Sequence, residues 1–531
     1  MKKLTLLPLL LLVLLTACTD RIFTTPSGIP QGVITPVTAY DGYHEYELVQ
    51  PLPIAPPPVS PTTYTNSNTT LRLAMRHPLT LNPLINEDVT VARILRLIFE
   101  PLILLDDNLR PTGHLAELDF ATDFSHALVM IRPDAFWSDG TPVTVEDLIF
   151  SIDTLRAAPQ AAIYRQNVDN IASITRLTSR SARVYFHNPS PCVAVSLGFP
   201  IIPHAHYRGN LDAQPLGNGM FLFENLTHMR NLTLTQNPTS FRHLSHLQDV
   251  EVIFLPDAKS QIYAFDQGRI DAIYLPLTEW VSHHTARHPS YEIFPAMYFE
   301  FIGFNFDSVF SNIHMRQGVA QAFDACTAVY AIYLHHAQRA LTPIHPSSFL
   351  AATDINILPY DQARARALFH AVPVHNPIVI IANEDNPQRV STAIRLELAL
   401  NAAGMATRTD ILPYEEYFAR LEEGSFDLFI GGMTLQYPPS LEIFFAGGFF
   451  MECEILADAY NHASQTFFNE TQYLQALAEF QQAFADRLPI ISLAFRHSAV
   501  LTNTRINQTA APAADNVFGL VNYWEYFANL E

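Results

Sequence analysis

The sequence predicts a mixed α/β protein with more than one lobe, and three observations carry this prediction. Apolar runs of strand length alternate with amphipathic stretches of helical spacing over about 460 residues, without a repeat of fixed period. The 531 residues are enough for two or three domains. Hydrophobic residues make up 49% of the chain and charged residues only 15%, which excludes a mainly disordered protein.

The N-terminal segment predicts export and lipid attachment. Two lysines precede Leu4–Leu15, an apolar run of about 12 residues that is too short to span a bilayer as a helix. The next residues, Thr16-Ala17-Cys18, complete a segment that resembles a bacterial lipobox. The alternative is an ordinary signal peptide with an incidental cysteine. The resemblance implies that residues 1–17 are removed, that Cys18 is lipidated, and that the protein is anchored outside the cytoplasm to the bacterial cell membrane.

Residues 18–68 have the composition of a spacer. Nine prolines and many threonines occur between Thr19 and Asn68, with little hydrophobic periodicity. Such a segment favours an extended chain over a packed element. We therefore predict a Pro/Thr-rich tether between the lipid anchor and the folded body.

The body begins after Leu71 and alternates between helix and strand signals. Residues 136–151 predict a strand end, an Asp-Gly turn and a helix that Thr144 caps together with Asp147. The other expected helices are 91–99, 316–333, 362–369, 391–403 and 472–484. The expected strands are 128–131, 250–255, 378–382, 427–430 and 490–495.

Composition and motifs exclude several functions. Acidic residues outnumber Lys plus Arg by 51 to 31, and the net charge of −20 argues against nucleic acid, because phosphate backbones bind basic surface. We find no G-x-S-x-G, H-E-x-x-H, G-x-x-x-x-G-K-[ST] or G-x-G-x-x-G motif. We therefore expect no catalytic residues, no cofactor and no enzymatic activity. A secreted hydrolase is the least favoured alternative.

Cysteine and histidine do not show the spacing of a structural metal or disulfide site. Cys192, Cys326 and Cys453 are an odd and widely spaced set, which predicts buried free thiols and one disulfide at most. The paired histidines are His204 and His206, His243 and His246, His283 and His284, and His335 and His336. They are scattered and have no acidic or thiolate partner at a characteristic distance, so we expect no metal site.

An ordered set of short segments carries a family resemblance over roughly residues 70–500. They are 79–83 (LTLNP), 97–102 (LIFEPL), 106–111 (DDNLRP), 136–151 (FWSDGTPVTVEDLIFS), 215–221 (PLGNGMF), 267–271 (QGRID), 302–305 (IGFN), 316–324 (RQGVAQAFD) and 360–365 (YDQARA). This set resembles the family 5 extracellular solute-binding proteins, the peptide- and nickel-binding components of ABC importers.

The resemblance implies a two-lobed, periplasmic-binding-protein-like fold of type II, in the large family 5 form, with a ligand cleft between the lobes. Lobe I would hold residues 69–293 together with 498–531, and lobe II would hold 294–497. The implied function is capture of an oligopeptide or similar small solute by a monomer, which delivers it to a membrane permease with its ATPase. The alternatives are presentation of a ligand to a sensor and binding of a metal chelate.

The candidate ligand-binding residues include one departure from the family pattern. Peptide-binding relatives place an Asp after a Gly-Trp pair, where it binds the ligand's amine. Here a turn is expected at Gly431-Gly432, Met433 replaces the Trp, and no Asp follows before Ser440. A buried ammonium without a counter-charge costs several kcal/mol. Glu442 is a possible substitute, although a solvated surface carboxylate is the simpler interpretation.

Aromatic walls with a few hydrogen-bonding groups suit a solute pocket, and core packing is the alternative for each residue. The predicted ligand-binding residues are Tyr164, Arg165, Tyr298, Glu300, Met433, Gln436 and Tyr437.

Overall fold

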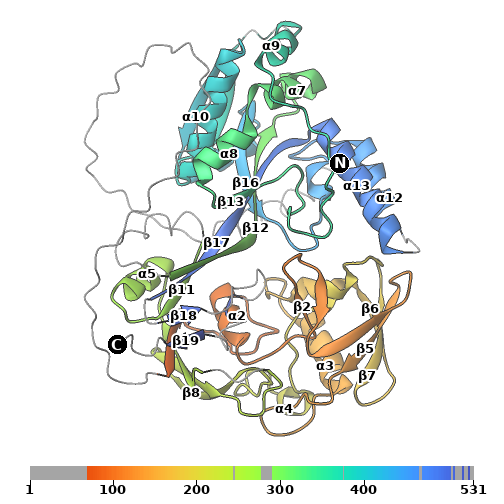
Figure 1. Ribbon diagram of the computed structural model, residues 1–531, viewed down its shortest axis with the longest axis vertical. Coiled ribbons are helices and arrows are strands. Elements are labelled where there is room, and N and C mark those ends of the chain that lie inside the picture. The colour runs from red at the N-terminus through yellow and green to blue at the C-terminus, as the bar shows by residue number, and fades with distance from the viewer. Residues whose placement is uncertain are drawn as a thin grey trace.

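Two bodies lie one above the other in the computed structural model, joined by the long strands β12 (Ser290–Phe304) and β17 (Ile490–Thr502) (Figure 1). The structure describes residues 69–242, 246–276, 290–372, 374, 376–465, 469–503, 506–508, 517–519 and 524–526. The predicted signal segment, Cys18 and the tether lie outside these residues. Among the described helices, none has the length and apolar character needed to cross a membrane.

The first body, the lower one in Figure 1, contains two four-stranded sheets and two two-stranded pairs. One sheet has the order β1 (Thr70–Met75), β10 (Asp249–Phe254), β9 (Asn231–Gln236), β8 (Phe221–Thr227). The other has the order β4 (Ala116–Phe120), β5 (His126–Ile131), β7 (Ser181–Phe186), β6 (Ile171–Arg176). Two-stranded pairs are formed by β2 (Ile103–Leu105) with β3 (Pro111–Gly113) and by β18 (Ile506–Gln508) with β19 (Trp524–Tyr526).

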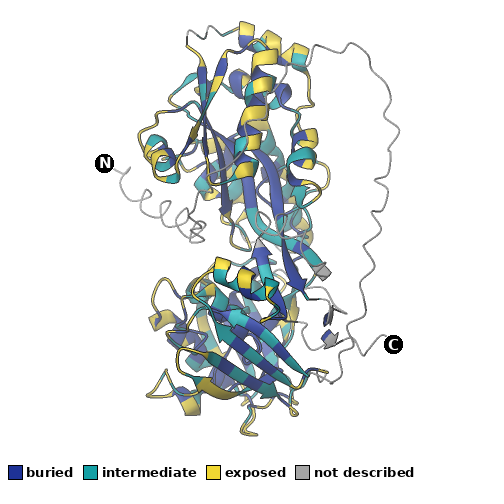
Figure 2. Cartoon of the chain, turned by 90° about the vertical axis from the view of Figure 1, so that its left-hand side faces the viewer, coloured by how far each residue is buried: buried dark blue, intermediate teal, exposed yellow. Residues whose placement is uncertain are grey.

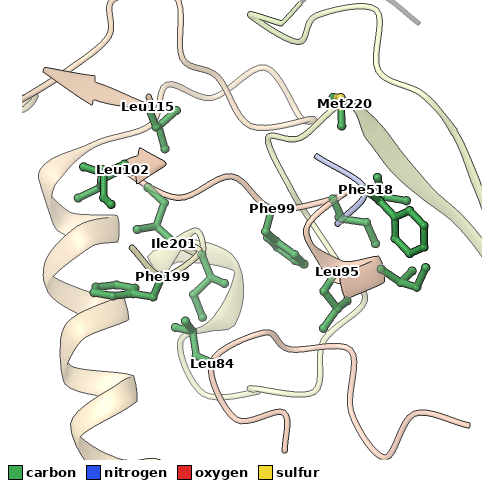
Figure 3. Packing of buried hydrophobic residues seen from close by; sticks show 14 of the residues in the cluster. Leu84, Leu95, Phe99, Leu102, Leu115, Phe199, Ile201, Met220 and Phe518 are labelled. Carbon is green, nitrogen blue, oxygen red and sulfur yellow. The ribbon is translucent and has the colours of Figure 1, made fainter. Parts of the chain in front are cut away.

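The core of the first body combines residues from both ends of the described chain. Leu95 and Phe99 pack with Met220 and with Phe518, which lies more than 400 residues further along the sequence (Figure 3). Trp524 is also buried in this core. The C-terminal part of the chain therefore returns to complete the first body.

The second body is built on a seven-stranded mixed sheet. Its order is β11 (Ala272–Pro276), β17, β12, β16 (Leu428–Thr434), β14 (Ile378–Asn383), β15 (Thr407–Leu412), and β13 (Ala337–Arg339) pairs with β17. Strand β14 runs parallel to both β15 and β16. The lower halves of β12 and β17 continue the same sheet towards the first body, where they remain largely buried or half-buried (Figure 2).

Helices cover both faces of this sheet because successive strand residues point to opposite sides. The α-helices among the described residues are α2 (Val89–Leu95), α3 (Val145–Ala157), α4 (His204–Tyr207), α5 (Ala258–Asp266), α7 (Ile313–Ala322), α8 (Ala325–Tyr333), α9 (Gln362–His370), α10 (Pro387–Ala402), α11 (Tyr414–Glu422), α12 (Glu454–Ala463) and α13 (Glu470–Arg487). Ile302 and Ile380 face a core with α7, α8, α9 and α10, whereas Phe301 and Ile381 face an aromatic core with α11, α12 and α13.

The mixed α/β prediction is confirmed, with boundary shifts that have local causes. Thr144 and Asp147 form the expected capping box of α3. The helix expected at 316–333 is two helices, because the carboxylate of Asp324 accepts a hydrogen bond from the Thr327 amide at 3.0 Å and starts α8 anew. The turn expected at Gly431-Gly432 is wrong, since both glycines lie inside strand β16.

Candidate functional site

A small cavity lies inside the second body, beside strand β16 and helix α11. Its walls include the side chains of Phe301, Tyr417, Phe429, Met433, Phe449 and Phe450. Arg389, in the first turn of α10, provides the charged group of this lining. An aromatic wall with one placed polar group suits a small ligand group.

Arg389 belongs to a buried ion-pair cluster that we call the Glu300 cluster, made of Tyr298, Glu300, Asn383, Arg389 and Arg496. Glu300 is fully buried, and its Oε2 accepts a hydrogen bond from Arg389 Nε at 3.0 Å. Its Oε1 accepts from Arg496 Nη1 at 3.3 Å. Arg389 also donates from Nη2 to the Tyr298 hydroxyl at 2.9 Å and from Nη1 to Asn383 Oδ1 at 3.3 Å.

The electrostatics of this cluster follow from its burial. Burial alone would lower the pKa of Arg389, but the Glu300 carboxylate beside it raises that pKa well above its ordinary value. The guanidinium of Arg496 lies over the Tyr298 ring, 4.7 Å from its centroid. Both oxygens of Glu300 accept from a guanidinium, so this carboxylate does not offer a free counter-charge to a buried ammonium. Glu442, the other candidate, is exposed at the start of a short helical turn.

Gly432 makes the close packing of the cluster possible. It is the direct partner of Glu300 where β12 pairs with β16. A Cβ atom at this position would lie 2.6 Å from Arg389 Nη2 and still closer to Glu300 Oε2. Glycine is therefore required here because the ion pair packs closely against the strand, and not because the chain turns.

The predicted residues of the first body lie at a contact with the second body. Tyr164 is half-buried against the first core and precedes the short helix η1 (Arg165–Asn170). Arg165 pairs with Asp169 at 2.6 Å. The neighbouring Gln166 accepts a hydrogen bond from the side-chain amide of Gln436 across the two bodies.

Tyr437 also lies at the contact between the bodies. Its hydroxyl is 3.0 Å from Ser348 Oγ and is hydrogen-bonded to the thiol of Cys192, which comes from the first body. Burial raises the pKa of Cys192 to about 12, so the thiol is protonated at neutral pH. Burial likewise raises the pKa of Tyr437.

The structure thus divides the seven predicted residues into two groups. Tyr298, Glu300 and Met433 converge on Arg389, whereas Tyr164, Arg165, Gln436 and Tyr437 lie at or beside the contact between the bodies.

Sequence reasoning missed Arg389 and Arg496. The helix that carries Arg389 was expected to begin only at Ser391. A usable signal was present, because Asn386 caps α10 and Pro387 occupies its first turn.

No convergence of three or more His, Cys, Asp or Glu side chains suited to a metal ion occurs among the described residues. His243, His283 and His284 lie outside the part of the chain that the structure describes.

Comparisons with known proteins agree with this architecture. A protein of Escherichia coli K12 named "Probable deoxycholate-binding periplasmic protein" is 25% identical over 306 residues, 52% of this chain and 57% of that protein. Heme-binding protein A of Haemophilus influenzae is 22% identical over 286 residues, 50% of this chain and 52% of that protein. The chain therefore matches less than two thirds of the length of either relative.

Solved structures match over most of the described chain. The ABC transporter substrate-binding protein CtaP of Listeria monocytogenes has a TM-score of 0.74 at 15% identity, covering 87% of this chain and all of that one. NikZ of Campylobacter jejuni, in complex with Ni(L-His), has a TM-score of 0.65 at 19% identity, covering 86% and 99%. These matches confirm the predicted periplasmic-binding-protein fold.

The family comparison is more specific than these fold matches. The sequence pattern of the bacterial extracellular solute-binding proteins, family 5 (middle region), matches residues 110–447, which is more than half of the chain. The chain belongs to the bacterial extracellular solute-binding proteins, family 5.

Proposed function

We propose that this protein is the substrate-binding component of an ABC importer, which captures an oligopeptide or similar small solute and passes it to a membrane permease with its ATPase. The observation that carries the proposal is the match to the family 5 solute-binding proteins over residues 110–447, with the aromatic cavity beside β16 and the Glu300 cluster next to it in the second body. A binding role needs no catalytic group, and the pocket supplies apolar walls and one guanidinium. The importer role is supported by the name of the Listeria protein that shares the fold.

The contacts of Glu300 constrain how a solute would be held. Because Glu300 already accepts from Arg389 and Arg496, the second body would not anchor a free ammonium through this carboxylate. We propose that the solute is held through the pocket walls, with Met433 and Tyr298 as contact residues. Tyr164, Arg165, Gln436 and Tyr437 would approach it from the contact between the bodies.

A binding experiment tests the function directly. Mass spectrometry of small molecules that co-purify with the protein should identify a bound solute, and isothermal titration should then give its affinity. Met433→Ala should weaken binding by about 10- to 100-fold, since it removes apolar contact from the pocket wall. Met229→Ala, at an exposed position of the first body, is the matched control. Absence of any co-purified solute, together with unchanged melting in peptide mixtures, nickel–histidine and deoxycholate, would contradict the proposal.

We further propose that the chain is a monomeric, lipid-anchored extracytoplasmic protein. In this division, 1–17 is the signal, 18–68 the tether, 69–293 with 498–531 lobe I, and 294–497 lobe II. Cys18→Ser should abolish acylation and move the protein out of the membrane fraction. Cys326→Ser, at an exposed thiol, is the control. Continued partition of the Cys18→Ser variant into detergent would count against the lipid anchor.

A further inference from the structure

The two bodies touch a second time on the side away from the crossover strands. In Figure 1, β2 lies to the right of β12 and β17, below α12 and α13. At this place Arg110 Nη2 and Nη1 donate to the two carboxylate oxygens of Glu470, at 2.7 and 3.1 Å. The Arg110 guanidinium also lies 4.0 Å from the centroid of the Phe349 ring. One arginine of the first body thus holds two side chains of the second.

A backbone hydrogen bond reinforces this contact. The amide of Phe349 donates to the carbonyl oxygen of Asn108 at 2.9 Å. Asn108 lies in the connection between β2 and β3, and Asp106 Oδ1 holds that connection by accepting from the amides of Asn108 and Arg110. Hydrogen bonds within the first body therefore hold the hairpin tip in the conformation that contacts the second body.

Cys192 adds a buried component. The residues that follow it, Val193 and Leu197, pack in the core of the first body. Cys192 itself is 1% exposed and belongs to the aromatic core of the second body, where its thiol is hydrogen-bonded to Tyr437. The thiol is therefore buried against side chains of the second body.

We propose that Asn108, Arg110 and Cys192 of the first body and Phe349, Tyr437 and Glu470 of the second form a clasp that holds the bodies closed opposite the crossover strands. With β12 and β17 on one side and the clasp on the other, the bodies are fixed at two separate places. Rotation about the crossover strands must break the Arg110–Glu470 pair and bring Cys192 into water. The clasp consists of protein contacts alone, so it acts whatever solute the protein binds.

Alkylation of Cys192 measures opening of the clasp. The full chain is treated with N-ethylmaleimide, and peptide-resolved mass spectrometry follows Cys192 separately from the exposed Cys326 and the half-buried Cys453. Glu470→Gln should speed labelling of Cys192 about two- to fivefold, as expected for loss of a half-exposed ion pair. Asp134→Asn is the matched control, because it breaks a comparably exposed pair, Arg132–Asp134, within the first body and should leave the rate unchanged.

The unmodified protein provides a second measurement that does not depend on any variant folding. Raising the ionic strength from 50 to 500 mM should also speed labelling of Cys192, since the exposed pair is screened. Equal rates for the unmodified protein and Glu470→Gln would overturn the clasp. The clasp would also be overturned if the labelling rate of Cys192 rose with urea as steeply as global unfolding does, because the thiol would then react only in the unfolded protein. Neither result bears on solute binding, which the titrations above test separately.

Discussion

Glu300 lies directly opposite Gly432 in the pairing of β12 with β16, and the missing side chain of the glycine leaves the space in which Arg389 reaches the Glu300 carboxylate. The three residues are far apart in the sequence and meet only through the sheet. The relationship links the strand that leaves the first body to the cavity beside β16. Substitution of each of the three residues tests how much it contributes to the stability of the protein.

Gly432→Ala should destabilise the protein by roughly 1–3 kcal/mol, because the added methyl group would lie 2.6 Å from Arg389 Nη2 and force the ion pair away from the strand. Urea denaturation measures the change in unfolding free energy. Thr434→Ala, at an exposed position of the same strand, should change stability by less than about 0.5 kcal/mol. Equal stability of the two variants would show that the glycine is not needed for the packing.

Glu300→Gln should cost about 3–5 kcal/mol, because it leaves the guanidiniums of Arg389 and Arg496 buried without their carboxylate. Adding Arg389→Gln to this variant should cost less than the same substitution in the unmodified protein, since the partner is already lost. A double-mutant cycle from urea melts gives the coupling energy. Strict additivity of the two substitutions would contradict the pairing.

Mild acid should weaken the second body through His345. Burial, with His497 nearby, lowers the pKa of His345 from 6.5 to about 4, and its Nδ1 accepts a hydrogen bond from the Ser347 amide at 3.1 Å. The folded state therefore favours the neutral ring. Its stabilising effect is complete above pH 6.5 and is lost as the pH falls towards 4. Between pH 7 and 5 the loss should be about 2 kcal/mol.

His345→Gln should reduce this pH dependence in urea melts at pH 5, 6 and 7. His314→Gln, at an exposed position, should keep the full dependence. Parallel stability curves for His345→Gln and the unmodified protein would exclude the assignment.

Stronger acid should act on the first body through Glu100. Burial alone would raise the pKa of Glu100, but Arg242 and His114, 3.3 and 2.7 Å from its oxygens, lower it to about 2. A carboxylate whose pKa is lowered by folding stabilises the protein above its unfolded pKa of 4.5, and this stabilisation is lost as the pH falls towards 2. The loss should be on the order of 3 kcal/mol. Glu100→Gln should flatten the acid limb of the stability curve, whereas Glu117→Gln, at an exposed position, should retain it.

The elements that the sequence predicted correctly have local signals. The capping box at Thr144, the helix at 362–369 and the strand at 378–382 all depend on neighbours within a few residues, and each occurs in the structure. The expected turn at Gly431 failed for the opposite reason. The sheet partner of Gly432 decides its role, and that partner is 132 residues away in the sequence.

Only part of the candidate site could be predicted from the sequence. Tyr298 and Glu300 are among the predicted ligand-binding residues, but their partner Arg389 is 89 residues from Glu300, and Arg496 is 196 residues away. No spacing rule connects such positions. The contact between Arg110 and Glu470 joins residues 360 positions apart, so a local sequence pattern does not predict it either.

The return of the C-terminal segment to the first core has a consequence for the order of assembly. Val500 packs in the same core as Leu71, and joining them in an unfolded chain would close a loop of about 430 residues. Gly303 and Ile490, where the chain enters and leaves the second body, are paired neighbours in the sheet. Once the second body has folded, β17 lies beside β12, and Val500 reaches the first core through a much shorter closure. The first body, although it comes first in the sequence, therefore completes its core only after the second body has folded.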